Sequence, residues 1–264
     1  MSSPEPEITA MTRLFGNLKP PETRRCESHG DYTATNYVAD RWSACPICTQ
    51  IERDAEEKRK AEKEAREMQA RIEAWIGRAG IPPRFRDRTL EAFVASTDAQ
   101  RRALEFCQAY VASFADVLAT GRSAIFTGRP GTGKTHLAAA IGAALVKNRR
   151  SVVFTSVFRA VRRVKDSWRR DSEETETEAV AAFVDPDLLI LDEVGVQFGS
   201  ETEKLLMFDI LNERYENRRP VLLLTNLPVK DAQAYLGERI FDRLREDGGE
   251  HIPFDWESYR GRHG

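Results

Sequence analysis

The stretch GRPGTGKTH, residues 128–136, constrains the fold of this chain more than any other part of its sequence. It contains the pattern G-x-x-x-x-G-K-S/T, with Gly128, Gly133, Lys134 and Thr135 at the fixed positions. The apolar run SAIF lies just before it, and the helix-forming run HLAAAIGAALVK begins at its last residue. A strand, a glycine-rich turn and a helix in this order predict a phosphate-binding loop.

This loop predicts a nucleotide site. Its glycines let backbone N–H groups surround the phosphates, and the N-terminus of the following helix adds a favourable dipole. We expect Lys134 to reach the β- and γ-phosphates and the Thr135 hydroxyl to bind Mg²⁺. The residues predicted to bind the nucleotide are Gly128, Arg129, Pro130, Gly131, Thr132, Gly133, Lys134, Thr135 and His136.

A second apolar run, LLILDEVG at residues 188–195, ends in two acidic residues. An Asp at the end of such a strand, here Asp192, can hold Mg²⁺ or its water ligands. The adjacent Glu193 can polarise an attacking water, which extends the prediction from nucleotide binding to hydrolysis. A third run, PVLLLTN, ends in Asn226, whose amide could lie near the γ-phosphate and the water. Asn is also a common turn residue at the end of a strand.

Short apolar runs alternate with helix-like stretches from about residue 86 onward. The runs cover residues 123–128, 151–156, 187–194 and 220–226. Strands that are buried on both faces have this composition. We therefore predict an α/β fold in which a mostly parallel sheet lies between layers of helices.

Composition divides the chain into three parts. Residues 51–76 are rich in Glu, Lys, Arg and Ala, which predicts a solvent-exposed linker helix. Glycine and paired prolines in GRAGIPPRF then end that helix. We expect a small zinc-binding module at residues 1–50, the charged linker helix at 51–76, and the ATPase domain at 77–264.

Net charge and hydropathy exclude several classes of protein. The 264-residue chain has a formal net charge of −2, so nucleic-acid binding would need a local basic patch. The N-terminus MSSPEPEITA is polar and acidic, unlike a signal peptide. No apolar run reaches the ~18 residues that a membrane span needs. We expect a cytoplasmic protein whose four cysteines are thiols or metal ligands.

Three of these cysteines and one histidine form two short pairs, Cys26-x₂-His29 and Cys45-x₂-Cys48. Four soft ligands in two pairs predict a closed, tetrahedral, structural Zn²⁺ site. So small a module needs such a cross-link to fold. A redox pair at CPIC would need a βαβ setting, which the surrounding sequence lacks. The fourth cysteine, Cys107, is expected to lie buried in a helix.

The stretch VFRAVRRVKDSWRR, residues 157–170, predicts a basic helix. Phe158, Val161, Val164 and Trp168 fall at roughly helical spacing and are expected to form one apolar stripe. Cations beside an exposed Trp suit single-stranded nucleic acid. The predicted DNA contacts are Arg162, Arg163, Lys165, Trp168 and Arg169. The alternative is an amphipathic helix with its Trp in the core and a solvated basic face.

The order of the phosphate loop, LLILDEVG, LLLTN and LGERIFDRL resembles AAA+ ATPases, in particular DnaC-type replicative helicase loaders of the DnaC/IstB-like group. The resemblance covers about residues 75–260. It implies that Asn226 is the first sensor residue. It also implies that Arg243, with Arg239 as the alternative, is an arginine finger that reaches the γ-phosphate of a neighbouring subunit. We therefore expect a self-associating AAA+ domain without a lid domain, which uses ATP and Mg²⁺.

The resemblance also implies a function. Residues 157–170 resemble the insert with which such loaders engage single-stranded DNA, and the zinc module resembles the part that docks on the hexameric replicative helicase. We expect an ATP-dependent loader that delivers this helicase onto single-stranded DNA during replication initiation, with slow hydrolysis stimulated by DNA or partner. Two alternatives are a transposition helper ATPase acting on duplex DNA and a transposase, and a nucleotide-gated adaptor with incidental hydrolysis.

Overall fold

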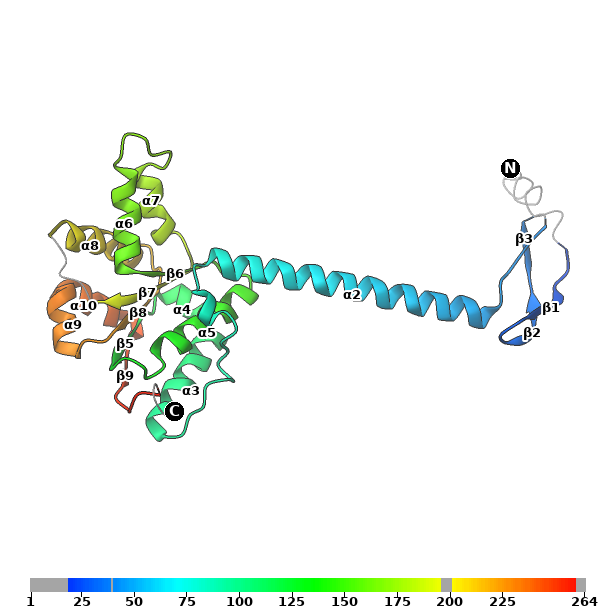
Figure 1. The fold of residues 1–264 in the computed structure, drawn as a ribbon, viewed down its shortest axis with the longest axis horizontal. Helices are drawn as coiled ribbons and strands as arrows, with labels where there is room; N and C mark the ends of the chain where they lie inside the picture. Colours follow the sequence, from blue (N-terminus) through cyan, green and yellow to red (C-terminus); the bar gives the residue numbers. More distant parts are fainter. Residues whose placement is uncertain (1–18, 39, 196–200, 260–264) are drawn as a thin grey trace, which may run out of the picture. The chain divides into compact units, whose positions relative to one another are not determined.

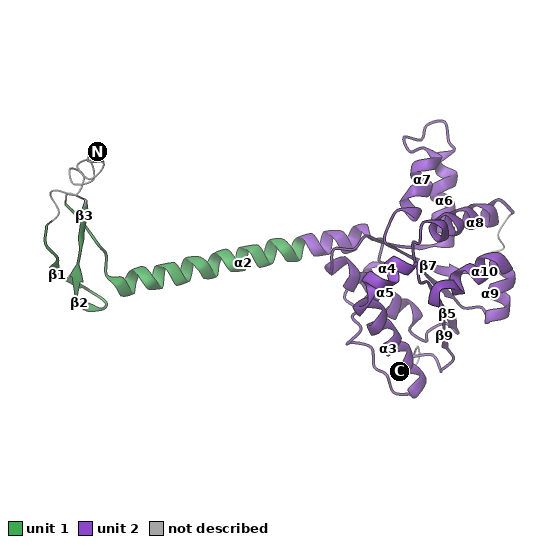
Figure 2. Cartoon of the chain, turned by 180° about the vertical axis from the view of Figure 1, so that it is seen from behind, with its two compact units in different colours: residues 1–70 green, residues 71–264 purple. Residues whose placement is uncertain are grey.

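The computed structural model describes residues 19–38, 40–195 and 201–259 (Figure 1). The chain divides into two compact units, residues 1–70 and 71–264, and each is described by itself (Figure 2). None of the described helices combines the length and the apolar character that crossing a lipid bilayer requires.

The first unit contains two small antiparallel hairpins, β1 with β2 and β3 with β4. Their strands are β1 (Glu22–Cys26), β2 (Gly30–Ala34), β3 (Asn36–Val38) and β4 (Arg41–Trp42). Cys26 pairs with Gly30 at the closed end of the first hairpin, so the turn between them places His29 beside Cys26. Gly30 has a φ of 78°, a left-handed conformation that glycine adopts at little steric cost.

Helix α2 (Pro46–Arg78) is 33 residues long and extends the predicted helix at both ends. Proline is tolerated in the first turn of a helix, so α2 begins inside CPIC and carries Cys48 in its first turn. Its one buried residue is Ile76; the charged side chains elsewhere remain in solvent. Gly80 follows the end of the helix at a φ of 75°, where a Cβ would lie 2.5 Å from the carbonyl oxygen of Phe154.

The second unit contains a five-stranded sheet with the order β6-β7-β8-β5-β9, in which every pairing is parallel. Its strands are β5 (Ala124–Gly128), β6 (Val152–Ser156), β7 (Leu188–Val194), β8 (Val221–Thr225) and β9 (Glu250–Phe254). Four of them match the predicted apolar runs, which confirms the α/β fold. No apolar run predicts β9, because only Phe254 of this edge strand is fully buried.

Successive strand residues face opposite layers of helices (Figure 1). In β5, Ala124 and Phe126 pack into the core formed with α3, α4 and α5, whereas Ile125 packs into the core formed with α6, α7, α8 and α10. The helical elements are η1 (Pro83–Phe85), α3 (Asp98–Ala112), α4 (Phe114–Thr120), α5 (Lys134–Lys147), α6 (Val157–Ser167), α7 (Glu176–Val184), α8 (Glu201–Glu216), α9 (Val229–Leu236), α10 (Glu238–Arg245) and η2 (Glu246–Gly248).

Cys107 and Arg214 are fully buried in these layers. Cys107 lies inside α3, as predicted, and burial raises the pKa of its thiol. Arg214 of α8 donates to the carbonyl oxygens of Phe183, Val184 and Pro220 at 2.7, 2.9 and 2.7 Å. Burial also lowers the pKa of Arg214, to about 9. This guanidinium satisfies carbonyl groups where α7 ends and where β8 begins, a role that no apolar pattern predicts.

Candidate nucleotide-binding site

The phosphate loop joins the end of β5 to the start of α5, and two of its glycines occupy positions that no other residue fits. A Cβ on Gly128, whose φ is 141°, would lie 2.2 Å from the carbonyl oxygen of Phe254. A Cβ on Gly133, whose φ is 100°, would lie 2.7 Å from the ring of Phe93. Tight packing and left-handed backbone therefore both require glycine here, and the loop leaves its N–H groups free of side-chain bulk.

Lys134 points into the loop that precedes it. Its Nζ donates to the carbonyl oxygens of Gly128 and Arg129, at 2.6 and 2.9 Å, and the residue is only 6% exposed. The hydroxyl of Thr132 donates to the same Arg129 carbonyl, at 2.8 Å. The ammonium is thus held at the centre of the loop by neutral acceptors, which a phosphate oxygen can replace with a stronger, charge-assisted bond.

The acidic end of β7 lies beside the start of α5. The hydroxyl of Thr135 donates to Oδ2 of Asp192 at 3.1 Å, and the N–H of Glu193 donates to Oδ1 at 2.7 Å. Burial raises the pKa of the Asp192 carboxyl, opposed by these two hydrogen bonds and by the charge of Lys134. Glu193 itself is exposed, with a φ of 60°. A hydroxyl and a carboxylate in contact are oxygen ligands that suit Mg²⁺.

A cavity of about 630 Å³ opens beside the loop, large enough for a nucleotide. The structure brings together in its lining the predicted residues Pro130, Gly131, Thr132, Gly133, Lys134, Thr135, His136, Asp192, Glu193 and Asn226. Gly128 and Arg129 contribute to the loop from outside this lining, through the carbonyl groups that hold Lys134. Segments more than 90 residues apart in the sequence thus meet at the carboxyl ends of the strands.

Aromatic and basic residues that sequence reasoning gave no role complete the cavity. The indole N–H of Trp256 donates to the Thr132 carbonyl at 2.9 Å, and the Tyr259 N–H donates to the Gly131 carbonyl at 2.9 Å. The ring of Phe93 packs edge-on against His136, with centroids 5.6 Å apart. The other lining residues without a predicted role are Arg84, Phe85, Arg88, Ala92, Val94 and Gln100. Two motifs in the sequence point to part of this lining. GIPPRF contains Phe85, and FDWESYR contains Trp256 and Tyr259.

The two candidate arginine fingers lie on α10 and do not line this cavity. Arg243 is half-buried, with its guanidinium 4.6 Å from the ring centroid of Tyr215. The hydroxyl of Tyr215 in turn donates to Glu246 at 2.5 Å. Arg239 is exposed, with its guanidinium 5.7 Å from the ring centroid of Phe208. Both guanidinium groups rest on aromatic rings.

The four predicted metal ligands of the first unit converge. Their ligand atoms, on Cys26, His29, Cys45 and Cys48, all lie within 4.8 Å of one another. Nδ1 of the histidine lies 3.6, 3.8 and 3.3 Å from the three sulfur atoms, in that order, and two of the sulfurs are 3.6 Å apart. Separations of this size are those of ligands around one tetrahedral ion with bonds of about 2.0–2.3 Å. The residues present therefore fit Zn²⁺.

Helix α6 differs from the expected apolar stripe. Its buried residues are Val157, Ala160, Val161 and Val164. Phe158 and Trp168 are 50% and 47% exposed, because the buried face is centred on the valines and Trp168 follows the last helical residue. The reading with the Trp in the core is therefore wrong, and both aromatic rings are available on the surface.

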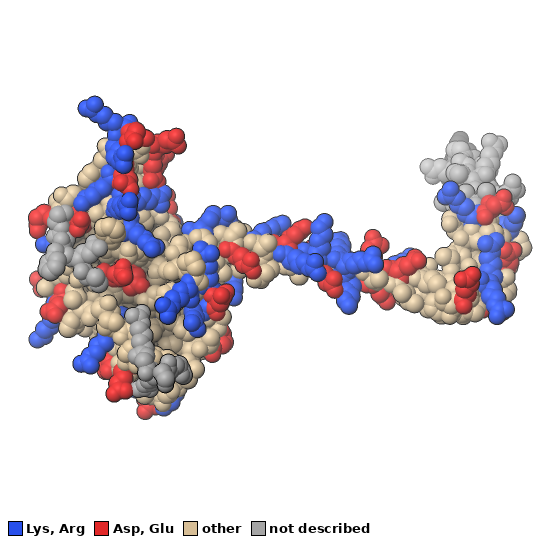
Figure 3. Space-filling model, in the orientation of Figure 1, with Lys and Arg blue, Asp and Glu red and all other residues tan. Residues whose placement is uncertain are grey.

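All four predicted DNA-binding cations near α6 lie within 4 Å of a carboxylate. Arg163 makes a two-pronged contact with Glu174, Lys165 bonds Glu203 at 3.1 Å, and Arg169 bonds Asp171 at 3.2 Å. Arg162 lies 3.8 Å from Asp166. Figure 3 shows acidic and basic side chains side by side over the end of α6 and α7. The acidic turn after α6 thus neutralises part of the basic surface.

Comparison with known proteins places the chain in a family. The family model described as IstB-like ATP binding protein matches residues 57–264. The replicative helicase loader DnaC of Escherichia coli K12 is 35% identical over 201 residues, which are 76% of this chain and 80% of that protein. The uncharacterised protein YdaV of the same strain is 35% identical over 205 residues, 77% and 80% of the two chains.

Solved structures agree in fold. The crystal structure of the DnaC helicase loader matches with a TM-score of 0.58 at 24% identity, covering 65% of this chain and 99% of that one. The crystal structure of DnaI matches with a TM-score of 0.57 at 20% identity, covering 68% and 94%. Family model, relatives and fold together confirm the resemblance indicated by the motifs: the chain belongs to the IstB/DnaC-like family of AAA+ ATP-binding proteins.

Proposed function

We propose that this protein is an ATP-dependent loader that binds the replicative DNA helicase and delivers it onto single-stranded DNA. The observation that carries the proposal is the alignment with a relative named replicative helicase loader, over 80% of that relative's length. The complete phosphate-loop cavity beside Asp192 and Glu193 supports the ATP-dependent part.

In the proposed nucleotide site, the loop N–H groups and Lys134 bind the phosphates of ATP. Thr135 and Asp192 hold Mg²⁺, which supplies positive charge to the phosphate oxygens. Glu193 polarises the attacking water, and Asn226 at the end of β8 positions that water. Burial, which raises the pKa of Asp192, also keeps its carboxylate poorly solvated until a cation arrives.

The proposed arginine finger acts between copies of the chain. Arg243 and Arg239 lie outside their own chain's cavity, which supports a role at the cavity of a neighbouring copy. Arg243 is our choice, on the motif LGERIFDRL, and self-association through the AAA+ domain follows from it. Mixing a variant that lacks Lys134 with one that lacks Arg243 tests this assignment, because only mixed assemblies would then contain an intact site.

The proposed zinc module, with Zn²⁺ held by Cys26, His29, Cys45 and Cys48, docks on the hexameric helicase. Its support is the convergence of the four ligand atoms and its place ahead of the ATPase unit. The proposed DNA contacts are those of α6 and the turn after it. The exposed Trp168 supports stacking on a base, and a DNA strand would compete with the acidic partners of the arginines.

The test is co-elution with the replicative helicase of the organism that encodes the chain. We would compare the full chain, the Lys134→Ala variant and residues 71–264 alone, with and without ATP and Mg²⁺. We expect the full chain to bind and the isolated second unit to lose binding. If the full chain does not bind the helicase but binds duplex DNA and a transposase, it is a transposition helper. Binding without any turnover in the presence of DNA and partner would indicate an adaptor.

A further inference from the structure

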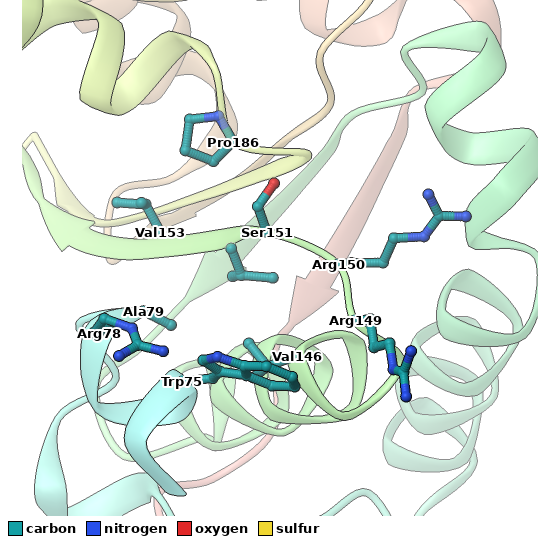
Figure 4. A pocket seen from close by; sticks show the side chains of 10 residues that line it. Trp75, Arg78, Ala79, Val146, Arg149, Arg150, Ser151, Val153 and Pro186 are labelled. Atoms are coloured by element: carbon teal, nitrogen blue, oxygen red, sulfur yellow. The ribbon is translucent and has the colours of Figure 1, made fainter. Parts of the chain in front are cut away.

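A second cavity of the ATPase unit, whose lining Figure 4 shows, shares no lining residue with the cavity beside the phosphate loop. Its volume is about 350 Å³, and all ten lining residues belong to residues 71–264. They come from the end of α2, from the end of α5 and the loop after it, and from the start of β6. Pro186, ahead of β7, completes the lining. Because the strands are parallel, this places the cavity at their amino ends, whereas the nucleotide loop lies at a carboxyl end.

The walls of this cavity, called the Trp75 cavity below, are mainly apolar. Figure 4 shows Trp75 and Val146 on one side and Val153 and Pro186 on the other. Trp75 is half-buried, and its other contacts are with the core around α5. A concave apolar surface of this size suits one or two apolar side chains, and Trp is among the residues that most often dominate binding sites.

Three arginines surround these walls. Figure 4 shows Arg78 on one side of Trp75 and Arg149 on the other, with Arg150 beyond. Within the described part of the chain, none of the three guanidinium groups has a carboxylate partner, unlike the paired cations around α6. The nearby carboxylate of Asp187 is bound by the Ser151 N–H and by Arg219. The rim therefore carries uncompensated positive charge.

Asp187 adds little negative charge to this rim. Its carboxylate accepts a bond from the Ser151 N–H at 3.0 Å and from Arg219 at 3.0 Å. Arg219 thus neutralises Asp187, and the exposed Asp185 is the other carboxylate next to the lining residue Pro186 in sequence. The three arginines of the rim outnumber these two carboxylates, which favours an acidic ligand.

The backbone at the rim is also unusual. Arg149 has a φ of 60°, just after the end of α5, where its N–H bonds the Val146 carbonyl at 3.0 Å. The next N–H, of Arg150, bonds the Leu145 carbonyl at 2.9 Å. This arrangement ends many helices, and glycine is the usual residue in it. An arginine in the left-handed conformation carries a steric cost that glycine avoids. The sequence has Arg149 at this position in place of the usual glycine, so a guanidinium lies at the rim.

We propose that the Trp75 cavity docks an acidic segment of a partner protein, in which one apolar side chain is flanked by carboxylates. The apolar side chain fills the space beside Trp75, and the flanking carboxylates pair with Arg78 on one side and with Arg149 and Arg150 on the other. Nucleic acid fits less well, because sites for single strands are open grooves with stacking platforms rather than aliphatic pockets. The nucleotide site stays free, since the two cavities lie at opposite ends of the strands.

The experiment measures binding of a fluorescein-labelled peptide, GEEGFGEEG, to the full-length chain by fluorescence anisotropy. Matched peptides replace its Phe by Ser or its Glu residues by Lys, and a labelled 12-nucleotide single strand is titrated in parallel. The variants are Arg78→Ala, Arg149→Gly and Val153→Asp. Arg149→Gly removes the guanidinium and relieves the backbone, so its fold is secure. Arg102→Ala, at an exposed position of α3, is the matched control.

We expect each of the three cavity variants and the Ser peptide to weaken binding at least about tenfold, while Arg102→Ala leaves peptide binding unchanged. Equal binding of the Phe and Ser peptides would reduce the site to a general basic patch and overturn the proposal. The proposal would also be overturned if the Arg78→Ala and Arg149→Gly variants bound the peptide as tightly as the wild type does. The same holds if the wild type did not bind the peptide at millimolar concentration. Tighter binding of the single strand through the same arginines would reassign the cavity to nucleic acid.

Discussion

The phosphate loop and helix α6 both present cationic side chains, but they hold them differently. In the loop, Lys134 is 6% exposed, and its ammonium bonds neutral backbone carbonyls. Around α6, Arg163 and Arg169 lie in solvent and pair with carboxylates of the following turn. The printed hydrogen bonds of Lys134 thus go to neutral groups, whereas the cations of α6 form ion pairs with acids of the same chain.

This difference predicts how strongly a mutation in each region should change ligand binding. A buried cation surrounded by glycine backbone has one geometry, so altering it alters the whole site. An exposed ion pair is weak and is screened by salt, so removing it shifts affinity only slightly. We therefore expect the largest effects from changes in the loop and the smallest from changes around α6.

Lys134→Ala should have the largest effect. Losing the charge-assisted bonds to the phosphates is expected to weaken ATP binding by about 100-fold or more, measured by isothermal titration calorimetry. Lys147→Ala, at the exposed end of the same helix, is the matched control and should bind ATP as the wild type does. Unchanged affinity in the first variant would refute the assignment of the loop.

Gly133→Ala should destabilise the protein even without nucleotide. The new Cβ would meet the Phe93 ring at 2.7 Å in a backbone with a φ of 100°, so we expect the free energy of unfolding to fall by about 1–3 kcal/mol. Urea denaturation measures this. Gly77→Ala, in α2 with open space around it, should instead be neutral or slightly stabilising. Equal stability of both variants would contradict the packing of the loop.

Asp192→Asn separates stability from metal binding. Burial raises the folded-state pKa of Asp192 above 3.8, so ionising this carboxyl disfavours the folded state. Without ligand, the wild type should therefore be less stable than the variant. This difference should grow as the pH rises above 3.8 and stay constant above the folded-state pKa. Thermal unfolding across pH checks this, with the exposed Asp209→Asn as the control. The variant should also lose the dependence of nucleotide binding on Mg²⁺.

Glu174→Gln should have the smallest effect. It releases Arg163 for phosphate contacts, so we expect single-stranded DNA to bind about two- to threefold more tightly at low salt, with a slightly steeper salt dependence. Glu173→Gln, whose carboxylate forms no ion pair among the described residues, is the control. Weaker DNA binding in the first variant would show that the acidic turn supports this surface rather than masks it.

Sequence reasoning predicted the features that local backbone rules govern. The loop glycines, the four apolar strands and the Cys-x₂-His and Cys-x₂-Cys pairs are all written in residues a few positions apart. It did not predict β9, whose sequence EHIPF has no apolar run, or the contacts of Trp256 and Tyr259 with the loop. Those features depend on residues that meet from opposite ends of the domain.

The amino-acid sequence alone is enough to predict the phosphate loop, the buried parallel sheet and the Cys/His cluster. It can do so because turns, strand burial and ligand spacing are local properties. Other features become visible only in the folded chain. Trp168 is exposed, Glu174 forms an ion pair with Arg163, and three arginines line the apolar cavity beside Trp75. The reason is physical: exposure and the partner of a charge depend on which distant segments pack together, and no single stretch of sequence specifies that.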